Sequence, residues 1–305
     1  MRFFRWAGLS LALISVFCAK TAGAGASISA VSGNIFFGKA CPADAATKGR
    51  DVCAQEKIGA KSSATYSDAV RLIYPQLKQD GTAADSKTPR EEFGGFGSAE
   101  DKPASTPLGA GDPLFYLRVA DGNSLRLLVL NGNTGLLGYV QAEPELKLMD
   151  LVGVAQDQHV SLNADYGVLP VRAGEFVFFA NSWHFNSSES YNSYALYLAG
   201  AERVRQVYDG PFLYGFSQPN RPECRIGQLL KPLQPLPAGP AGYAGLRLRI
   251  TEQRVCQGNS REILGPERKF EAELKWGAAK GKYMGGSREL HRLNNCRMEG
   301  KPGCG

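Results

Sequence analysis

A repeated alternation of apolar runs and turn residues covers residues 113–216. Pairs such as Asp121-Gly122 and Asn131-Gly132 stand between the runs, and such pairs favour the tight turns of β-hairpins. The pattern therefore predicts an antiparallel β-meander. Its expected strands are Leu114–Val119, Leu125–Leu130, Leu146–Val154, Gly167–Val171, Phe176–Ala180, Tyr194–Leu198 and Val204–Tyr208.

The C-terminal part of the chain shows a stricter pattern with a period of two. Leu246–Ile250 and Phe270–Trp276 alternate apolar with charged residues, which is typical of a sheet with one face in water. Shorter strands are expected at Lys282–Met284 and Arg288–Leu293. Prolines cluster in residues 217–242 before these strands, and they favour an extended connection there.

One segment has the period of a helix. Its apolar side chains recur at helical spacing and form one stripe, made by Tyr66, Ala69, Val70, Ile73 and Leu77. Thr65 followed three residues later by Asp68 resembles a capping box, and Pro75 should end the helix near Ile73 or Tyr74. The stripe could serve a partner helix or a membrane surface, but packing on the protein's own sheet is the commoner use.

Residues 81–112 lack a periodic pattern and are rich in Gly, Pro, Ser, Thr and charged residues. Such a composition buries too little apolar area to offset the entropy of ordering the chain. We expect a flexible linker or a long surface loop, with Phe93 and Phe96 holding it to the core.

Together these patterns predict a mostly β protein, an antiparallel meander of sandwich-like or blade-like form, with one N-terminal helix and disulfide staples. The expected divisions are a leader (1–24), a cysteine-stapled segment with the helix (25–80), the linker (81–112), an antiparallel β region (113–216), and a proline-rich connection with a C-terminal β section (217–305).

The first residues have the features of a cleavable signal peptide. Arg2 and Arg5 precede the apolar run Ala7–Ala19, and Ala22-Gly23-Ala24 offers the small residues that a signal peptidase needs. The apolar run is too short to anchor the chain in a bilayer, which needs about 20 residues. We expect a periplasmic or secreted protein, of bacterial origin, without stable membrane insertion after cleavage.

Charge argues against a nucleic-acid partner. The chain has 35 basic and 29 acidic residues, and three of the basic ones, Arg2, Arg5 and Lys20, lie in the leader. The remaining chain is close to neutral and lacks the basic stripe that nucleic-acid binding requires.

The cysteines of the mature chain are even in number, which in an exported protein indicates disulfides. They are Cys41, Cys53, Cys224, Cys256, Cys296 and Cys304. Short loops close at low entropic cost, so proximity favours Cys41–Cys53, Cys224–Cys256 and Cys296–Cys304. A metal site is not expected, because the chain has no Cys-x-x-Cys and its three histidines, His159, His184 and His291, are widely spaced.

The densest group of polar and aromatic residues is Asn181–Asn192, between two expected strands. The pattern predicts a long hairpin loop, and loops on rigid sheets often carry binding residues. Trp183 and Tyr191 would supply contact area, while His184 and Glu189 would supply polar specificity. The alternative is a polar turn whose aromatic residues fold back on the core.

No catalytic or cofactor motif is present: the chain lacks Gly-x-Ser-x-Gly, a glycine-rich phosphate loop and His-Glu-x-x-His. We therefore expect no cofactor, and a non-catalytic binding or interaction protein of the bacterial envelope whose partner is another envelope or secreted protein. An inhibitor, an immunity protein and a binder of an envelope component all fit.

A hydrolase acting on cell-wall or exported polymers is the main alternative, with carboxylates such as Glu143 and Glu145, or Asp157 and Asp165, as candidate groups. A structural surface protein is a third. A buried carboxylate pair in a cleft would favour the hydrolase, and an exposed aromatic patch would favour the binding protein.

Overall fold

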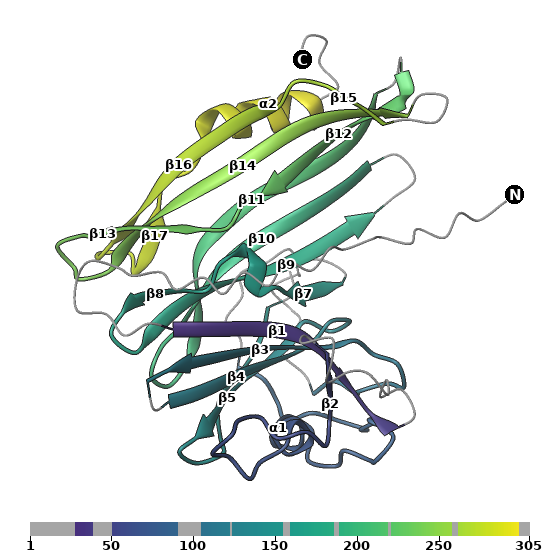
Figure 1. Ribbon diagram of the computed structural model, residues 1–305, viewed down its shortest axis with the longest axis vertical. Coiled ribbons are helices and arrows are strands. Elements are labelled where there is room, and N and C mark those ends of the chain that lie inside the picture. The colour runs from purple at the N-terminus through teal and green to yellow at the C-terminus, as the bar shows by residue number, and fades with distance from the viewer. Residues whose placement is uncertain are drawn as a thin grey trace, which may run out of the picture.

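The computed structural model describes residues 28–38, 51–90, 105–122, 124–154, 159–185, 189–218, 221–257 and 262–298. The expected leader, Cys41 and Cys304 lie outside these ranges. The described chain is mostly β, in two sheets stacked one above the other with a helix below them (Figure 1). No helix in the described ranges combines the length and the apolar character that crossing a membrane would require.

The first sheet has six strands in the order β2-β1-β3-β4-β5-β6. Its four consecutive strands β3 to β6 form the predicted antiparallel meander, and β1 pairs antiparallel with β3 and parallel with the short β2. β5 was not among the expected strands. The strands are β1 (Ile28–Phe36), β2 (Val52–Cys53), β3 (Leu114–Asp121), β4 (Ser124–Asn131), β5 (Leu136–Glu143) and β6 (Lys147–Gly153).

Helix α1 (Tyr66–Ile73) covers one face of this sheet and begins and ends where the sequence predicts. The backbone N–H of Asp68 donates to Thr65 Oγ1 (3.2 Å), and the backbone N–H of Thr65 donates to Asp68 Oδ2 (2.9 Å). This second bond is the main reason that the pKa of Asp68 lies below its usual value. The apolar stripe packs on the protein's own sheet, against residues that include Leu127 and Val140.

The second sheet has eleven strands, with the main order β17-β16-β14-β12-β11-β10-β9-β7. Its pairings are antiparallel. Outside the main order, β8 pairs with β9, and both β13 and β15 pair with β14. Its strands are β7 (Val160–Leu162), β8 (Leu169–Arg172), β9 (Glu175–Phe185), β10 (Glu189–Ala199), β11 (Val204–Gln218), β12 (Arg221–Leu230), β13 (Gln234–Ala238), β14 (Ala244–Gln257), β15 (Glu262–Leu264), β16 (Arg268–Gly277) and β17 (Lys282–Met284).

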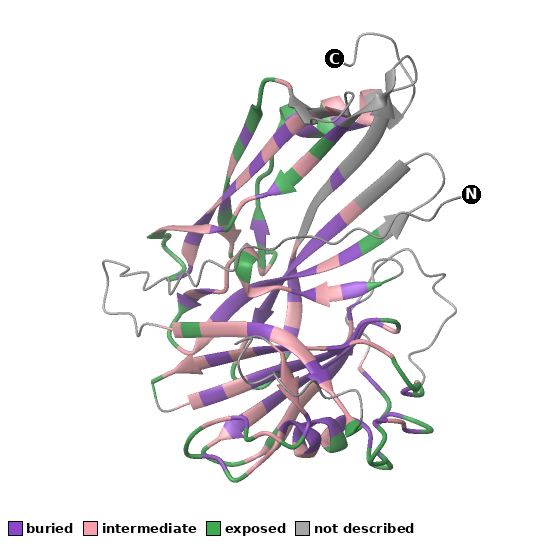
Figure 2. Ribbon diagram, turned by 45° about the vertical axis from the view of Figure 1, so that its right-hand side comes forward, coloured by how far each residue is buried: buried purple, intermediate pink, exposed green. Residues whose placement is uncertain are grey.

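The hairpin β9–β10 is buried on both faces and joins two hydrophobic cores. On one face Phe178 and Tyr197 pack against first-sheet residues such as Leu128. On the other face Val177 and Leu196 pack against the remainder of the second sheet. Figure 2 shows how buried positions alternate with less buried ones in the outer strands, as in β16.

Two expectations for the C-terminal part were wrong. Residues 217–242 are not merely a connection, because β12 and β13 lie within them. Proline has no backbone N–H to donate, so it is tolerated at strand starts and in edge strands. Pro222 lies near the start of β12, and β13 is an edge strand that pairs only with β14.

The expected strand Arg288–Leu293 is instead part of a second helix, α2 (Arg288–Met298), so the chain has more than the one predicted helix. Ser287 Oγ accepts a hydrogen bond from the backbone N–H of Leu290 and acts as the N-terminal cap of α2. Leu290 and Asn294, four positions apart on one helix face, are buried. A stripe of so few apolar residues gives a weak sequence signal.

Both described flanks of the expected linker belong to the core rather than to a free connection. Ala83 and Leu108 are buried and bond each other through their backbones, N to O, at 3.0 Å in both directions. The central part of the linker, residues 91–104 with Phe93 and Phe96, lies outside the described residues.

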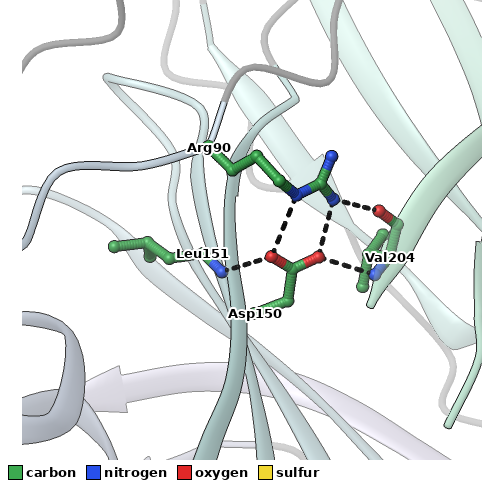
Figure 3. A network of polar contacts seen from close by, with 4 residues as sticks. All are labelled: Arg90, Asp150, Leu151 and Val204. Carbon is green, nitrogen blue, oxygen red and sulfur yellow. Dashed lines mark hydrogen bonds and ion pairs between the residues drawn. The ribbon is translucent and has the colours of Figure 1, made fainter. Parts of the chain in front are cut away.

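At the end of the first flank, Arg90 enters a polar network with Asp150 of β6 and Val204 of β11 (Figure 3). The Asp150 carboxylate accepts hydrogen bonds from Arg90 Nη2 (2.8 Å), Arg90 Nε (3.3 Å), Leu151 N (3.0 Å) and Val204 N (2.8 Å). Arg90 Nη2 also donates to the carbonyl oxygen of Val204 (2.8 Å). One buried carboxylate thus joins the linker flank and both sheets.

Replacing Asp150 by Ala should lower the free energy of unfolding by about 2–3 kcal/mol, because Arg90 and the backbone N–H of Val204 lose a charged acceptor. The exposed pair of Arg71 and Asp68 provides the control, since Arg71→Ala should cost under about 0.5 kcal/mol. Urea denaturation followed by circular dichroism measures both. Equal effects of the two substitutions would show that the network does not hold the sheets together.

Replacing Thr65 by Ala should destabilise the protein by about 1 kcal/mol, because the Asp68 N–H at the start of α1 loses its acceptor. Thr65→Ser keeps a hydroxyl at the same place and should restore most of the loss. The same denaturation experiment measures both variants. A Ser variant as unstable as the Ala variant would rule out capping as the cause.

Candidate functional site

The segment expected to be a hairpin loop, Asn181–Asn192, is largely strand. β9 continues to Phe185 and β10 begins at Glu189, so residues 186–188 form the connection and lie outside the described residues. The two strands pair without a register shift, from Phe176 opposite Ala199 to Phe185 opposite Ser190. Aromatic residues favour strands, which explains why a segment of polar composition continues the ladder.

Strand geometry divides the four predicted binding residues between two faces of the hairpin. Trp183 pairs with Asn192, and His184 pairs with Tyr191. Because successive residues of a strand alternate between faces, position 183 lies on the face opposite to positions 184 and 191. Glu189 lies two residues from Tyr191 and belongs to that second face. The structure therefore brings positions 184, 189 and 191 to one face and leaves Trp183 on the other.

Among the residues of this hairpin whose burial is described, Trp183 is the large apolar one that remains open to solvent, with 44% of its surface exposed. Its ring lies 6.0 Å from the ring of His159, and its backbone N–H donates to the carbonyl oxygen of His159 at 3.1 Å. His159 precedes β7, is itself exposed, and has a φ of +54°. A non-glycine residue in this left-handed region carries strain, and such strain often occurs at binding sites.

Neutral polar residues surround Trp183 on its face of the sheet. Asn192 lies directly across from it, and the next row holds Ser161, Asn181 and Tyr194. Tyr194 is buried and its hydroxyl contacts the Tyr166 hydroxyl at 3.3 Å. Burial is the main cause that raises the pKa of Tyr194, so its hydroxyl remains protonated. We call Trp183, His159, Asn192, Ser161 and Asn181 the Trp183 surface.

This surface contains no Asp, Glu, Lys or Arg, so it offers an exposed aromatic ring beside neutral hydrogen-bonding groups. That combination suits recognition of a partner surface, because an aromatic residue combines a large apolar area with few rotatable bonds. Sequence reasoning selected Trp183 but missed His159, which β7 brings beside it through a pairing between strands distant in sequence.

Of the acids considered at the outset, the structure describes Glu143, Glu145 and Asp165. Glu143 and Glu145 flank Pro144 at the end of β5, with Glu145 exposed, and Asp165 is exposed in the 3₁₀ turn Ala164–Tyr166. Asp157 lies outside the described residues. Within the described ranges, no three His, Cys, Asp or Glu residues are grouped as metal ligands.

Comparison with models of known protein families finds no match, and searches of curated proteins and of solved structures find no similar chain either.

Proposed function

We propose that this chain is an exported, extracytoplasmic binding or interaction protein of the bacterial envelope, which contacts its partner through the Trp183 surface. An inhibitor, an immunity protein and a binder of an envelope component are the roles that fit. The observation that carries the proposal is the exposed Trp183 ring on a hairpin that is buried on both faces closer to its base.

The support comes from rigidity as well as exposure. Phe178, Phe179 and Tyr197 are fully buried just before the exposed part of the hairpin, which fixes the backbone that carries Trp183. A rigid site loses little conformational entropy on binding, and buried tryptophans dominate the energy of many protein interfaces.

The extracytoplasmic location rests on the sequence of the leader, Arg2, Arg5, the apolar run Ala7–Ala19 and the small residues before residue 25. A near-neutral mature chain supports a partner other than nucleic acid.

Disulfides form part of the same proposal. Cys224 and Cys256 lie directly opposite each other on the paired strands β12 and β14. Directly opposite positions have Cα atoms about 4.5–5.5 Å apart, which is within the range that a disulfide spans. Cys41–Cys53 and Cys296–Cys304 complete the proposed set, as their short separations in the sequence favour.

The first test compares Trp183→Ala with the parent in crosslinking pull-downs from envelope extract. The parent should capture a stoichiometric partner, and the variant should lose at least about tenfold in yield, since a central tryptophan typically contributes 2 kcal/mol or more. Leu229→Ala is the matched control because Leu229, in β12, is also an exposed apolar residue, with 51% of its surface accessible. It should capture the partner normally.

Capture that survives Trp183→Ala would move the interaction to another surface. If no form captures a partner, the binding function is wrong, and hydrolysis of cell-wall polymers becomes the activity to assay.

The disulfide set predicts that non-reduced, protease-digested protein contains a crosslinked fragment joining Cys224 to Cys256. Mass spectrometry should find this fragment before reduction and lose it afterwards. Thiol labelling of both cysteines in the folded, non-reduced protein would contradict the pairing.

A further inference from the structure

Strand β1 leaves most of one edge unpaired. Residues Ile28–Asn34 pair with β3 on one side, whereas on the other side β2 pairs only with Ile35 and Phe36. In Figure 1, β1 lies across the front of the first sheet, next to β3. Apart from the short β2, no strand of that sheet lies on the other side of β1 among the described residues.

The direction of the unpaired groups follows from the paired end of the strand. The Phe36 carbonyl oxygen accepts from the N–H of Ala54, after β2, and the Asn34 N–H donates to Asp51 Oδ1 at 3.1 Å. Even-numbered residues of β1 therefore direct their N–H and C=O groups away from β3, because these groups alternate along a strand. At Ile28 and Ala30 the structure gives these outward groups no partner among the described residues.

Several other edge strands of the two sheets carry features that hinder pairing. β6 begins with the exposed Lys147 and bonds Arg90 through Leu151, and β13 contains Pro235 and Pro237. β7 and β17 are only three residues long. Proteins use charges, prolines and short strands in this way to prevent a further strand from adding to a sheet. Ile28–Asn34 has neither a charged residue nor a proline.

A hollow of about 440 Å³ lies beside this edge, on the same face of the first sheet as α1, where Ile58 and Leu125 of the α1 core also line it. Ser29 and Val31 of β1 line it together with Arg118 of β3, Lys61 and Glu143. A strand added to β1 would place every second side chain on this same face, next to Ser29 and Val31.

The charges in the hollow are available to a ligand. Neither the Lys61 ammonium nor the Glu143 carboxylate forms an ion pair or hydrogen bond within the described chain. Arg118 uses Nη1 to bond the carbonyl oxygen of Ile58 at 2.8 Å, its charge also acts on the nearby Tyr66 hydroxyl, and its side chain lines the hollow. Two of the three charged side chains are cations, so the hollow complements an acidic side chain.

We infer that β1 is a docking strand: an extended peptide segment of a partner adds to its free edge through the backbone of Ile28 and Ala30, and places an acidic side chain in the hollow near Lys61 and Arg118. The regular alternation of donors and acceptors along the edge matches an extended polypeptide. This surface belongs to the first sheet and does not depend on Trp183.

The probe for this site is a fluorescently labelled synthetic peptide of alternating threonine and valine with one central glutamate. Fluorescence anisotropy with the purified protein should show saturable binding. Ala30→Pro removes a backbone N–H that points away from β3, so the pairing of β1 with β3 should remain. Peptide binding should weaken by about tenfold, because the added strand loses one backbone hydrogen bond. Ala30→Val retains the N–H and is the matched control.

Three further measurements do not depend on whether the proline variant folds. A peptide methylated on alternate backbone nitrogens should lose binding to the unaltered protein. The peptide should slow hydrogen exchange of the Ile28 and Ala30 amides in that protein. Lys61→Glu should weaken binding of the glutamate peptide and strengthen binding of a matched peptide with a central lysine.

Methylated and unmethylated peptides that bind equally would overturn strand addition. Equal binding of the glutamate and lysine peptides would overturn the acidic specificity. If peptide binding is absent and the protein instead forms dimers that Ala30→Pro disrupts, the edge pairs two copies of this chain and the peptide inference is wrong.

Discussion

The two-sided burial of the hairpin β9–β10 is the constraint on which the rest of this structure depends. Residues of even number in β9, such as Phe178, complete the core between the two sheets, and residues of odd number, such as Phe179, complete the core of the second sheet. A shift of the hairpin register by one residue would exchange these two sets and disrupt both cores together. The hairpin is therefore strongly fixed, and the position of Trp183 is fixed with it.

Polar groups between the sheets strengthen this arrangement because each has a defined partner. The Tyr139 hydroxyl donates to the carbonyl oxygen of Gly200 at 2.9 Å, and burial raises the pKa of Tyr139 to about 12. Its hydroxyl consequently remains a donor over the ordinary pH range. The Asp150 network adds charged hydrogen bonds close by, because Val204 N donates to Asp150. Gly200 and Val204 lie at the two ends of the connection from β10 to β11. Apolar packing supplies most of the stability, and these bonds select one alignment of the sheets.

The sequence predicts those elements whose signals are local. The meander follows from alternating apolar runs and turn pairs, and α1 follows from its stripe, the Thr65 cap and Pro75. Local sequence patterns do not predict features that depend on pairing between strands distant in sequence. The polar composition of Asn181–Asn192 hides the continuation of both strands, and the register with β10 shows which residues lie beside Trp183 and which lie beside position 184. His159 and the open edge of β1 depend on which strands become neighbours, which no short segment encodes.

The two tryptophans of the described chain show why exposure at position 183 carries functional weight. Trp276 stacks on Tyr243 at 4.0 Å between ring centroids, meets the edge of Tyr283 at 5.2 Å, and lies under the Arg205 guanidinium at 5.3 Å. These three groups come from different strands or turns, so Trp276 serves to close the second sheet. The Trp183 ring lies 6.0 Å from the His159 ring, and 44% of the Trp183 surface is exposed. A large aromatic side chain held rigidly but left this accessible offers a partner a substantial apolar contact area.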